Sequence, residues 1–402
     1  MMKLCSLLFA SLLVAPIAFA QSAASQNPAS LGAVERASAG DSPDNPGPLA
    51  TGLSPELSHK DIRAAMKKVA DWQVATGEKR FNQQWTFAAL YDGLLAYSRE
   101  TGDPVGHDAV LRMSEGFKWQ LIDVRFPHAD DQHIGYSYLD LYTEHPDPVR
   151  IAATKAIMDR LVARKDEPKA VWWWCDALYM APPVLVRLSK ITGDRKYILY
   201  MDHEWDVTKS LLYVNDEKLY FRDATFLQKT EANGKKLFWS RGNGWVLAGL
   251  AMILSELPAE DPLRPKYETQ FREMATKIAS LQGSDGLWRT GLLDAAAYKL
   301  PEISGSAFYT YAIAYGINHG LLDRTTFTPV VKKGWAGMVA HIYADGRLGS
   351  IQPIGAAPDA FQLSSSYVYG VGGFLLAGSE LDRMVDAKVG HLPARPKQGT
   401  AK

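Results

Sequence analysis

Cysteine is almost absent from this 402-residue sequence, which contains only Cys5 and Cys175. Cys5 lies in an amino-terminal segment with the pattern of a signal peptide, so export would leave Cys175 as the single cysteine. One cysteine cannot form an intramolecular disulfide, and stability must therefore come from packing. A chain of this length buries a large core without such cross-links.

The expected signal peptide spans residues 1–20. Lys3 supplies the basic start, residues 7–18 are apolar but too short to span a membrane, and residues 18–20 read Ala-Phe-Ala, a small-x-small cleavage pattern. No cysteine follows the cut, which argues against a lipoprotein anchor. We therefore expect an exported protein, periplasmic or secreted. No later stretch is long and apolar enough to predict a membrane helix.

The sequence also lacks an excess of either charge, with 44 Lys plus Arg and 44 Asp plus Glu. This balance argues against a nucleic-acid partner, because nucleic-acid binding requires a basic face. The HExxH, CxxC and dense His/Asp patterns of metal sites are missing, as are GxSxG, P-loop and Rossmann motifs. We therefore expect no catalytic metal and no cofactor.

What the sequence does contain is a helical pattern, with apolar residues three and four positions apart from Pro55 onward. Twelve helices are predicted: one from Ser58 to about Gly77, and others near 85–100, 105–120, 131–143, 147–164, 174–192, 195–211, 241–256, 263–282, 304–319, 325–341 and 363–379. Gly102 and Gly193 are expected to end the helices that precede them. Alternate helices are apolar or small on most sides. We therefore predict an all-α fold, an (α/α)6 toroid of six inner and six outer helices.

The helical region is expected to form one domain over residues 54–385. Residues 21–53 are rich in Ala, Ser, Gly and Pro, which predicts a flexible leader, and residues 386–402 are expected to form a flexible tail. A short hairpin is predicted where residues 212–214 and 219–221 flank a polar turn.

Unusual segments stand at the starts of the alternate helices. In an up-and-down ring these starts share one face, so their aromatic, acidic and glycine-rich residues would converge in one funnel. The positive ends of the helix dipoles also point there, which favours an anionic ligand such as a uronate. The segments are residues 85–87, 130–135, 172–176, 239–245, 302–306 and 364–367.

Carboxylates in these segments are candidate acids. Asp176 follows three tryptophans, and desolvation there would raise its pKa toward that of a general acid, although a helix cap or a satisfied core aspartate explains it equally well. Asp130 and Asp131 are adjacent, so one can cap a helix while the other faces the funnel, although two capping or solvated acids are commoner. His133 is interpreted as a polar lining or core residue.

Trp239 and Trp245 flank Arg241, with glycines that allow close approach of a ligand. The pattern is typical of stacking on a sugar beside a cation that binds its carboxylate; the alternative is a helix start packed against the core. Arg222, followed by Asp223, is most simply a salt-bridged surface residue.

At these segments the sequence resembles glycoside hydrolase family 105, the unsaturated rhamnogalacturonyl hydrolases, from about Ala65 to Leu381. The most specific matches are Trp174-x-Asp176-x-Leu-Tyr-Met and Trp239-Ser-Arg-Gly-Asn-Gly-Trp245. The resemblance implies an (α/α)6 barrel that removes a 4,5-unsaturated uronic acid from the non-reducing end of lyase products.

The resemblance also implies roles for individual residues. Asp176 is the implied general acid/base and Asp131 the assisting acid. On the hairpin, Arg222 stands where some family members have a histidine, which leaves the exact sugar open. The expected substrate contacts are Trp239, Arg241, Trp245, Asp130, His133, Trp174, Arg222 and Tyr91.

The implied chemistry needs one strongly perturbed acid. Protonation of the vinyl ether at C4 gives an oxocarbenium at C5, water adds there, and the hemiketal opens to expel the aglycone. Two alternatives stay open: another (α/α)6 enzyme, such as an inverting hydrolase or a lyase, and a sugar-binding protein without activity. A conventional hydrolase needs a second acid at hydrolytic distance.

Overall fold

The computed structural model describes residues 39–165 and 170–386. The expected signal peptide, the leader up to residue 38 and the tail from residue 387 lie outside the described residues. The inner helices are α3 (Trp85–Thr101), α6 (Ile134–Glu144), α9 (Pro182–Thr192), α11 (Ser240–Glu256), α13 (Ile303–Asn318) and α15 (Val368–Asp386). The outer helices are α2 (His59–Gly77), α4 (Val105–Gly116), α7 (Pro148–Val162), α10 (Lys196–Leu212), α12 (Arg264–Ser280) and α14 (Arg324–Val339).

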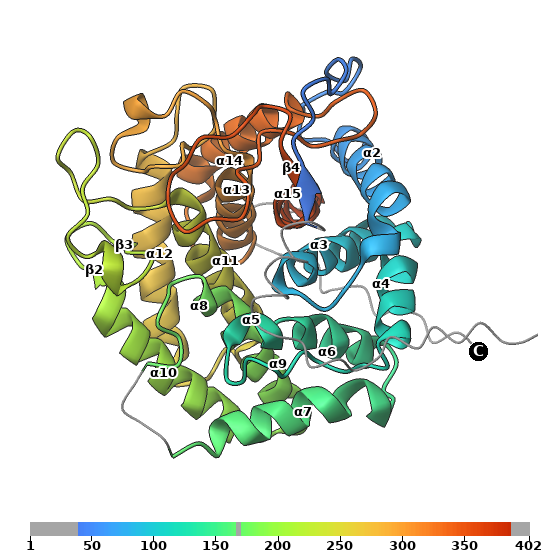
Figure 1. Ribbon diagram of the computed structural model, residues 1–402, viewed down its shortest axis with the longest axis vertical. Helices are drawn as coiled ribbons and strands as arrows, with labels where there is room; N and C mark the ends of the chain where they lie inside the picture. The colour runs from blue at the N-terminus through green and yellow to red at the C-terminus, as the bar shows by residue number, and fades with distance from the viewer. Residues whose placement is uncertain (1–38, 166–169, 387–402) are drawn as a thin grey trace, which may run out of the picture.

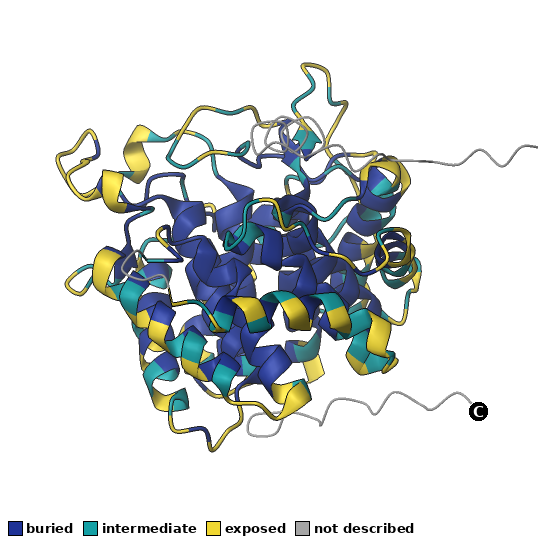
Figure 2. Cartoon of the chain, turned by 60° about the horizontal axis from the view of Figure 1, so that its bottom comes forward, coloured by how far each residue is buried: buried dark blue, intermediate teal, exposed yellow. Residues whose placement is uncertain are grey.

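The inner helices close into a ring. Each packs against the next in chain order, and α15 returns to pack against α3 (Figure 1). Residues of the inner helices are buried on nearly all sides, whereas the outer helices alternate buried and exposed residues (Figure 2). The predicted (α/α)6 toroid is therefore confirmed, and its core lies between and inside the inner helices.

Small residues permit this close packing. A Cβ atom added to Gly372 on α15 would lie 2.0 Å from the carbonyl oxygen of Ala89 on α3, so only glycine fits there. The predicted helix ends are also present: Gly102 and Gly193 end α3 and α9 with positive φ angles of 78° and 73°. Glycines thus allow α3 and α15 to pack closely and mark where α3 and α9 end.

Two inner helices are preceded by short separate helices, where the sequence predicted continuous ones. The first is α5 (Ala129–Gln132) before α6, and the second is α8 (Ala177–Met180) before α9. The second break falls at Pro182, which has no backbone N–H to continue the hydrogen-bonding pattern. Both breaks lie at the starts of inner helices, next to the candidate acids.

Short strands and turns join the helices. The predicted hairpin is confirmed as β2 (Tyr213–Val214) and β3 (Leu219–Tyr220). Three 3-10 turns span Glu78–Arg80, Ala224–Phe226 and Ala295–Ala297. Among the described residues, no helix has the length and apolar character needed to cross a membrane.

Part of the expected leader is ordered against the barrel. Strand β1 (Gly40–Asp41) pairs with β4 (Ser366–Tyr367), and Ala39 before it is fully buried. The backbone N–H of Ala50 donates to the carbonyl oxygen of Ile342 at 2.7 Å. Residues 39–53 therefore differ from the prediction, because pairing of their backbone groups with the barrel replaces hydrogen bonds to water.

Candidate functional site

The starts of the inner helices meet at one end of the toroid. The ring of Trp85, the first residue of α3, lies 5.4 Å from Tyr369 near the start of α15 and 5.9 Å from Trp245 on α11. Trp245 lies 4.2 Å from Phe308 on α13. Aromatic contacts therefore join four inner helices at this end, as the shared-face prediction requires.

Asp176 precedes α8 and is largely buried, with 8% of its surface exposed. The segment before it is fixed by the hairpin strand, since the N–H of Cys175 donates to the carbonyl oxygen of Arg222 at 2.8 Å. Burial raises the pKa of Asp176, whereas the charges of Arg222 and Arg241 lower it and Asp130 raises it. Burial is the largest influence, so the protonated form of Asp176 is favoured relative to a solvated aspartate.

Asp130 on α5 is a second acid with a perturbed pKa. Burial raises its pKa to about 7, against the lowering effect of Arg125. Its carboxylate lies 3.5 Å from Nδ1 of His128 and 4.0 Å from Nη1 of Arg125, both too distant for a strong hydrogen bond. Asp130 therefore retains a proton for much of the time near neutral pH.

Asp131 has a different environment. Arg125 Nε donates to both of its carboxylate oxygens at 3.0 and 3.2 Å, and a second guanidinium nitrogen also contacts it. Its side chain is 2% exposed. The two adjacent acids thus differ, but not through the predicted helix cap, because no side chain caps α5. Arg125 engages the carboxylate of Asp131, whereas the carboxylate of Asp130 lacks a strong partner.

His133 lies in the core between α5 and α6. Its Nδ1 lies 3.0 Å from the carbonyl oxygen of Met180, which only accepts, so Nδ1 donates. Its Nε2 lies 2.8 Å from Asp92 Oδ2, and Tyr179 also donates to that oxygen. Both ring nitrogens of His133 are therefore occupied by protein groups.

Tyr91 is also a core residue. Its hydroxyl donates to the carbonyl oxygen of Asn82 at 2.8 Å, accepts from the Asn82 N–H, and has no exposed surface. Neither Tyr91 nor His133 presents a free polar atom to a ligand. The structure assigns both side chains to the support of the helices.

The glycine-rich motif places Arg241 against a loop. Arg241 donates to the carbonyl oxygens of Gln352 and Pro353, both at 2.7 Å, and its guanidinium lies 4.5 Å from the Trp239 ring. Trp239 donates through Nε1 to the Gln352 side chain at 2.9 Å. The cation and the indole are therefore held rigidly together inside the protein. Trp239, Arg241 and Trp245 are only 2%, 1% and 1% exposed, which agrees with the alternative of a helix start packed against the core.

Arg222 lies beside the acid rather than on a remote surface. Its Nε is 3.6 Å from Asp176 Oδ2, and its Nη1 donates to Asp223 at 2.6 Å. The backbone of Trp174 forms an isolated bridge with Asp223, the residue after Arg222, and the Trp174 ring packs on the His128 ring at 4.5 Å. The structure thus brings together Asp176, Asp130, Arg222 and Trp174.

Two residues of the site were missed by the sequence reasoning. Arg125 binds Asp131, and burial, reinforced by Arg125, lowers the pKa of His128 to about 4, so that His128 is neutral at pH 7. Their one sequence signal is proximity to the acidic pair at residues 130–131. Among the described residues, no group of His, Cys, Asp and Glu side chains is arranged to hold a metal ion.

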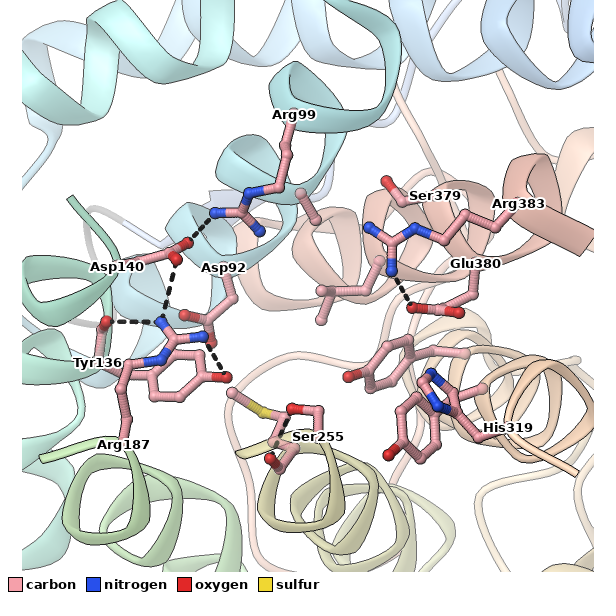
Figure 3. A pocket seen from close by; sticks show the side chains of 15 residues that line it. Asp92, Arg99, Tyr136, Asp140, Arg187, Ser255, His319, Ser379, Glu380 and Arg383 are labelled. Carbon is pink, nitrogen blue, oxygen red and sulfur yellow. Dashed lines mark hydrogen bonds and ion pairs between the residues drawn. The ribbon is translucent and has the colours of Figure 1, made fainter. Parts of the chain in front are cut away.

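A separate polar cavity of about 60 Å³ lies deeper in the ring, between the carboxyl-terminal halves of the inner helices (Figure 3). Its charged side chains include three arginines paired with carboxylates, such as Arg187 with Asp140 at 3.3 Å. Asp92 links this cavity to His133 below the acidic pair. The lining residues labelled in Figure 3 are Asp92, Arg99, Tyr136, Asp140, Arg187, Ser255, His319, Ser379, Glu380 and Arg383.

Comparisons with known proteins agree with this architecture. The model of Glycosyl Hydrolase Family 88 matches residues 57–385. An unsaturated 3S-rhamnoglycuronyl hydrolase from Formosa agariphila is 41% identical over 345 residues, 81% of this chain and 91% of that protein. A solved structure of a glycosyl hydrolase family 88 protein from Bacteroides vulgatus is 31% identical in sequence and has a TM-score of 0.77. The match covers 81% of this chain and 99% of that protein. A second solved structure, described as a polysaccharide lyase, is 32% identical and has a TM-score of 0.78. The match covers 83% of this chain and 99% of that protein.

Proposed function

This chain belongs to Glycosyl Hydrolase Family 88, and we propose that it removes a 4,5-unsaturated uronic acid from the non-reducing end of oligosaccharides made by polysaccharide lyases. The observation that carries the proposal is Asp176, a carboxyl group whose pKa is raised by burial beside a cation. The name of the Formosa relative supports a rhamnose-linked uronate as the substrate.

The finer family assignment is part of the proposal. The motif resemblance predicted family 105, whereas the matching family model is that of family 88. Motifs around Asp176 and Arg241 support the placement close to family 105, and the rhamnose in the relative's name agrees with it.

The proposed reaction begins with proton transfer from Asp176 to C4 of the vinyl ether. The C4–H bond forms as the C4–C5 double bond gives up its electron pair, and positive charge develops at C5. A water molecule adds to C5 and passes a proton to the Asp176 carboxylate, which restores the acid. The resulting hemiketal opens by breaking the C5–O5 bond, which leaves a ketone at C5 and a hemiacetal at C1. The hemiacetal then breaks its C1–O bond to the aglycone, so that C1 becomes an aldehyde and the aglycone leaves with the glycosidic oxygen as a hydroxyl group.

Neighbouring residues have distinct parts in this scheme. Arg222 lies where it can neutralise the substrate carboxylate, and the amino-terminal ends of the inner helices add positive potential. We propose Asp130, rather than Asp131, as the second acid that faces the sugar, since Arg125 already occupies Asp131. Asp131 then acts through Arg125 as a positioning residue.

The order of bond changes tests the reaction. NMR can follow the vinylic proton at C4 and the new reducing end of the aglycone in the same sample. Hydration predicts that the vinylic signal disappears no later than the aglycone appears. Direct cleavage at C1 would release the aglycone while the free uronate still carries its vinylic proton, and that order would overturn the proposal.

A further inference from the structure

We propose that Trp173 is the platform on which the first sugar of the aglycone packs, next to Arg222, the cation proposed to bind the carboxylate of the uronate. This inference rests on the proposed function, because it takes the unsaturated uronate to lie at Asp176. It adds a binding subsite for a second pyranose to the site described above.

Trp173 is exposed where its neighbours are buried. It is 45% exposed, whereas Trp172 and Trp174 are 0% and 3% exposed. An indole ring in water forgoes the burial that usually stabilises it, and exposed aromatic rings beside a site are a common means of binding ligands. The exposed ring is therefore available to cover an apolar surface.

Contacts of the next residue, Trp174, fix the backbone that carries Trp173. The Trp173 and Trp174 rings lie 4.7 Å apart, and Trp174 in turn packs on His128 and pairs with Asp223 on the neighbouring strand. A platform must hold its orientation before the ligand arrives, since ordering a side chain on binding costs affinity. Trp173 meets this requirement.

Arg222 connects the platform to the acid. Its guanidinium carbon lies 5.5 Å from the Trp173 ring, and its Nε lies 3.6 Å from Asp176. That Nε is buried and has no hydrogen-bond partner among the described residues. Arg222 therefore has an N–H free for the uronate carboxylate, and the indole face of Trp173 lies next to that cation, where the following sugar can pack.

The geometry also defines the ligand's class. C4 of the uronate must lie at Asp176, and C1 is across the same pyranose ring, so the aglycone begins one sugar ring away from the acid. The occupant is a pyranose with one apolar face. A 6-deoxy sugar fits best, because its methyl group adds apolar surface over the indole.

The test compares two substrates that share the unsaturated uronate, one linked to a methyl group and one linked to a rhamnose. For wild type, Trp173→Phe and Trp173→Ala, kcat and KM are measured from loss of the unsaturated chromophore. Trp173→Ala is expected to lower the preference for the disaccharide, the ratio of the two kcat/KM values, about tenfold, mainly through KM. Trp173→Phe should retain most of the preference.

Leu199→Ala serves as the control, since Leu199 is an exposed apolar residue on the outer helix α10. It should leave the preference unchanged. An unchanged ratio in Trp173→Ala would overturn the platform even if the wild type consumes both substrates. If the wild type consumes neither substrate, the proposed function itself is wrong, and the platform falls with it.

Discussion

Asp176 is subject to opposing influences at the scale of the single residue. Burial raises its pKa and Arg222 lowers it, and burial is the larger effect. A proton donor to carbon must be protonated and yet give up its proton, and this balance serves both needs. Asparagine has nearly the same size and hydrogen-bonding groups as aspartic acid but cannot donate the acid's proton. Asp176→Asn therefore tests the chemistry of the acid while keeping its packing.

We therefore predict that Asp176→Asn lowers kcat by a factor of about a hundred to ten thousand, with little change in KM or Tm. Steady-state kinetics and thermal unfolding measure these quantities. Asp194→Asn, at an exposed helix-capping position, is the matched control and should keep full turnover. A folded Asp176→Asn enzyme with near-normal turnover would refute the assignment.

The two adjacent acids should separate by pH dependence. Asp130 has a pKa raised to about 7, so wild-type kcat/KM should fall as the pH rises through 7, and Asp130→Asn should lose this inflection. A pH–rate profile of each variant measures it. Asp131→Asn should instead lower the free energy of unfolding by about 1–3 kcal/mol, because it weakens the bonds to Arg125.

The free energy of unfolding should also depend on pH, because of the raised pKa of Asp130. A raised pKa means that the folded state binds the Asp130 proton more tightly than the unfolded state does. The stability that the folded state gains from this tighter proton binding is fully present below about pH 3.8 and is lost as the pH rises through 7. Asp130→Asn should therefore be more stable than the wild type at pH 8, by a larger margin than at pH 5. An equal margin at both pH values would contradict the buried position of this acid.

At the scale of the element, the contact between α3 and α15 is set by glycine. We predict that Gly372→Ala lowers the free energy of unfolding by about 1–3 kcal/mol, because its Cβ would collide with the Ala89 carbonyl group. Chemical denaturation measures the change. Gly116→Ala on the outer helix α4, where a Cβ meets no atom within 4 Å, should instead raise stability by about 0.5–1 kcal/mol. Equal effects at both positions would argue against close packing of the inner ring.

Helix positions were largely predictable because apolar spacing and end signals are local. Gly102 and Gly193 indicated the ends of α3 and α9, and both have the expected left-handed conformation. The separate helix α8 was not predicted, although Pro182 was visible, because an apolar run continued across it. The order in residues 39–53 was also missed, because it depends on pairing with β4, more than 300 residues away.

The sequence predicted which acids stand at the starts of the inner helices, but not which side chains contact them, and it placed the core residues His133 and Tyr91 in the site. The sequence identified Asp176, Asp130, Asp131 and Arg241, since each stands at the start of an inner helix. It could not show that Arg125 binds Asp131, or that aromatic rings from four other helices surround Trp245. Those contacts arise only when the ring closes.

At the scale of the whole molecule, the toroid gathers chemistry at the amino-terminal ends of its inner helices. The proposed reaction uses carboxylic acids and cationic side chains alone. We therefore predict that activity survives exhaustive chelation, measured after dialysis against a strong chelator and compared with a sample resupplied with divalent ions. Loss of activity that a divalent ion restores would show that the acids do not suffice.

The central claim is that this chain consumes the unsaturated uronate itself. The most direct measurement follows the ultraviolet absorbance of that group while enzyme is added to lyase-generated rhamnose-linked oligosaccharides, with saturated oligosaccharides as the parallel sample. We expect loss of absorbance together with release of the shortened oligosaccharide, and no reaction of the saturated sample. Cleavage of saturated substrates without loss of absorbance, or a rise in absorbance from new double bonds, would contradict it.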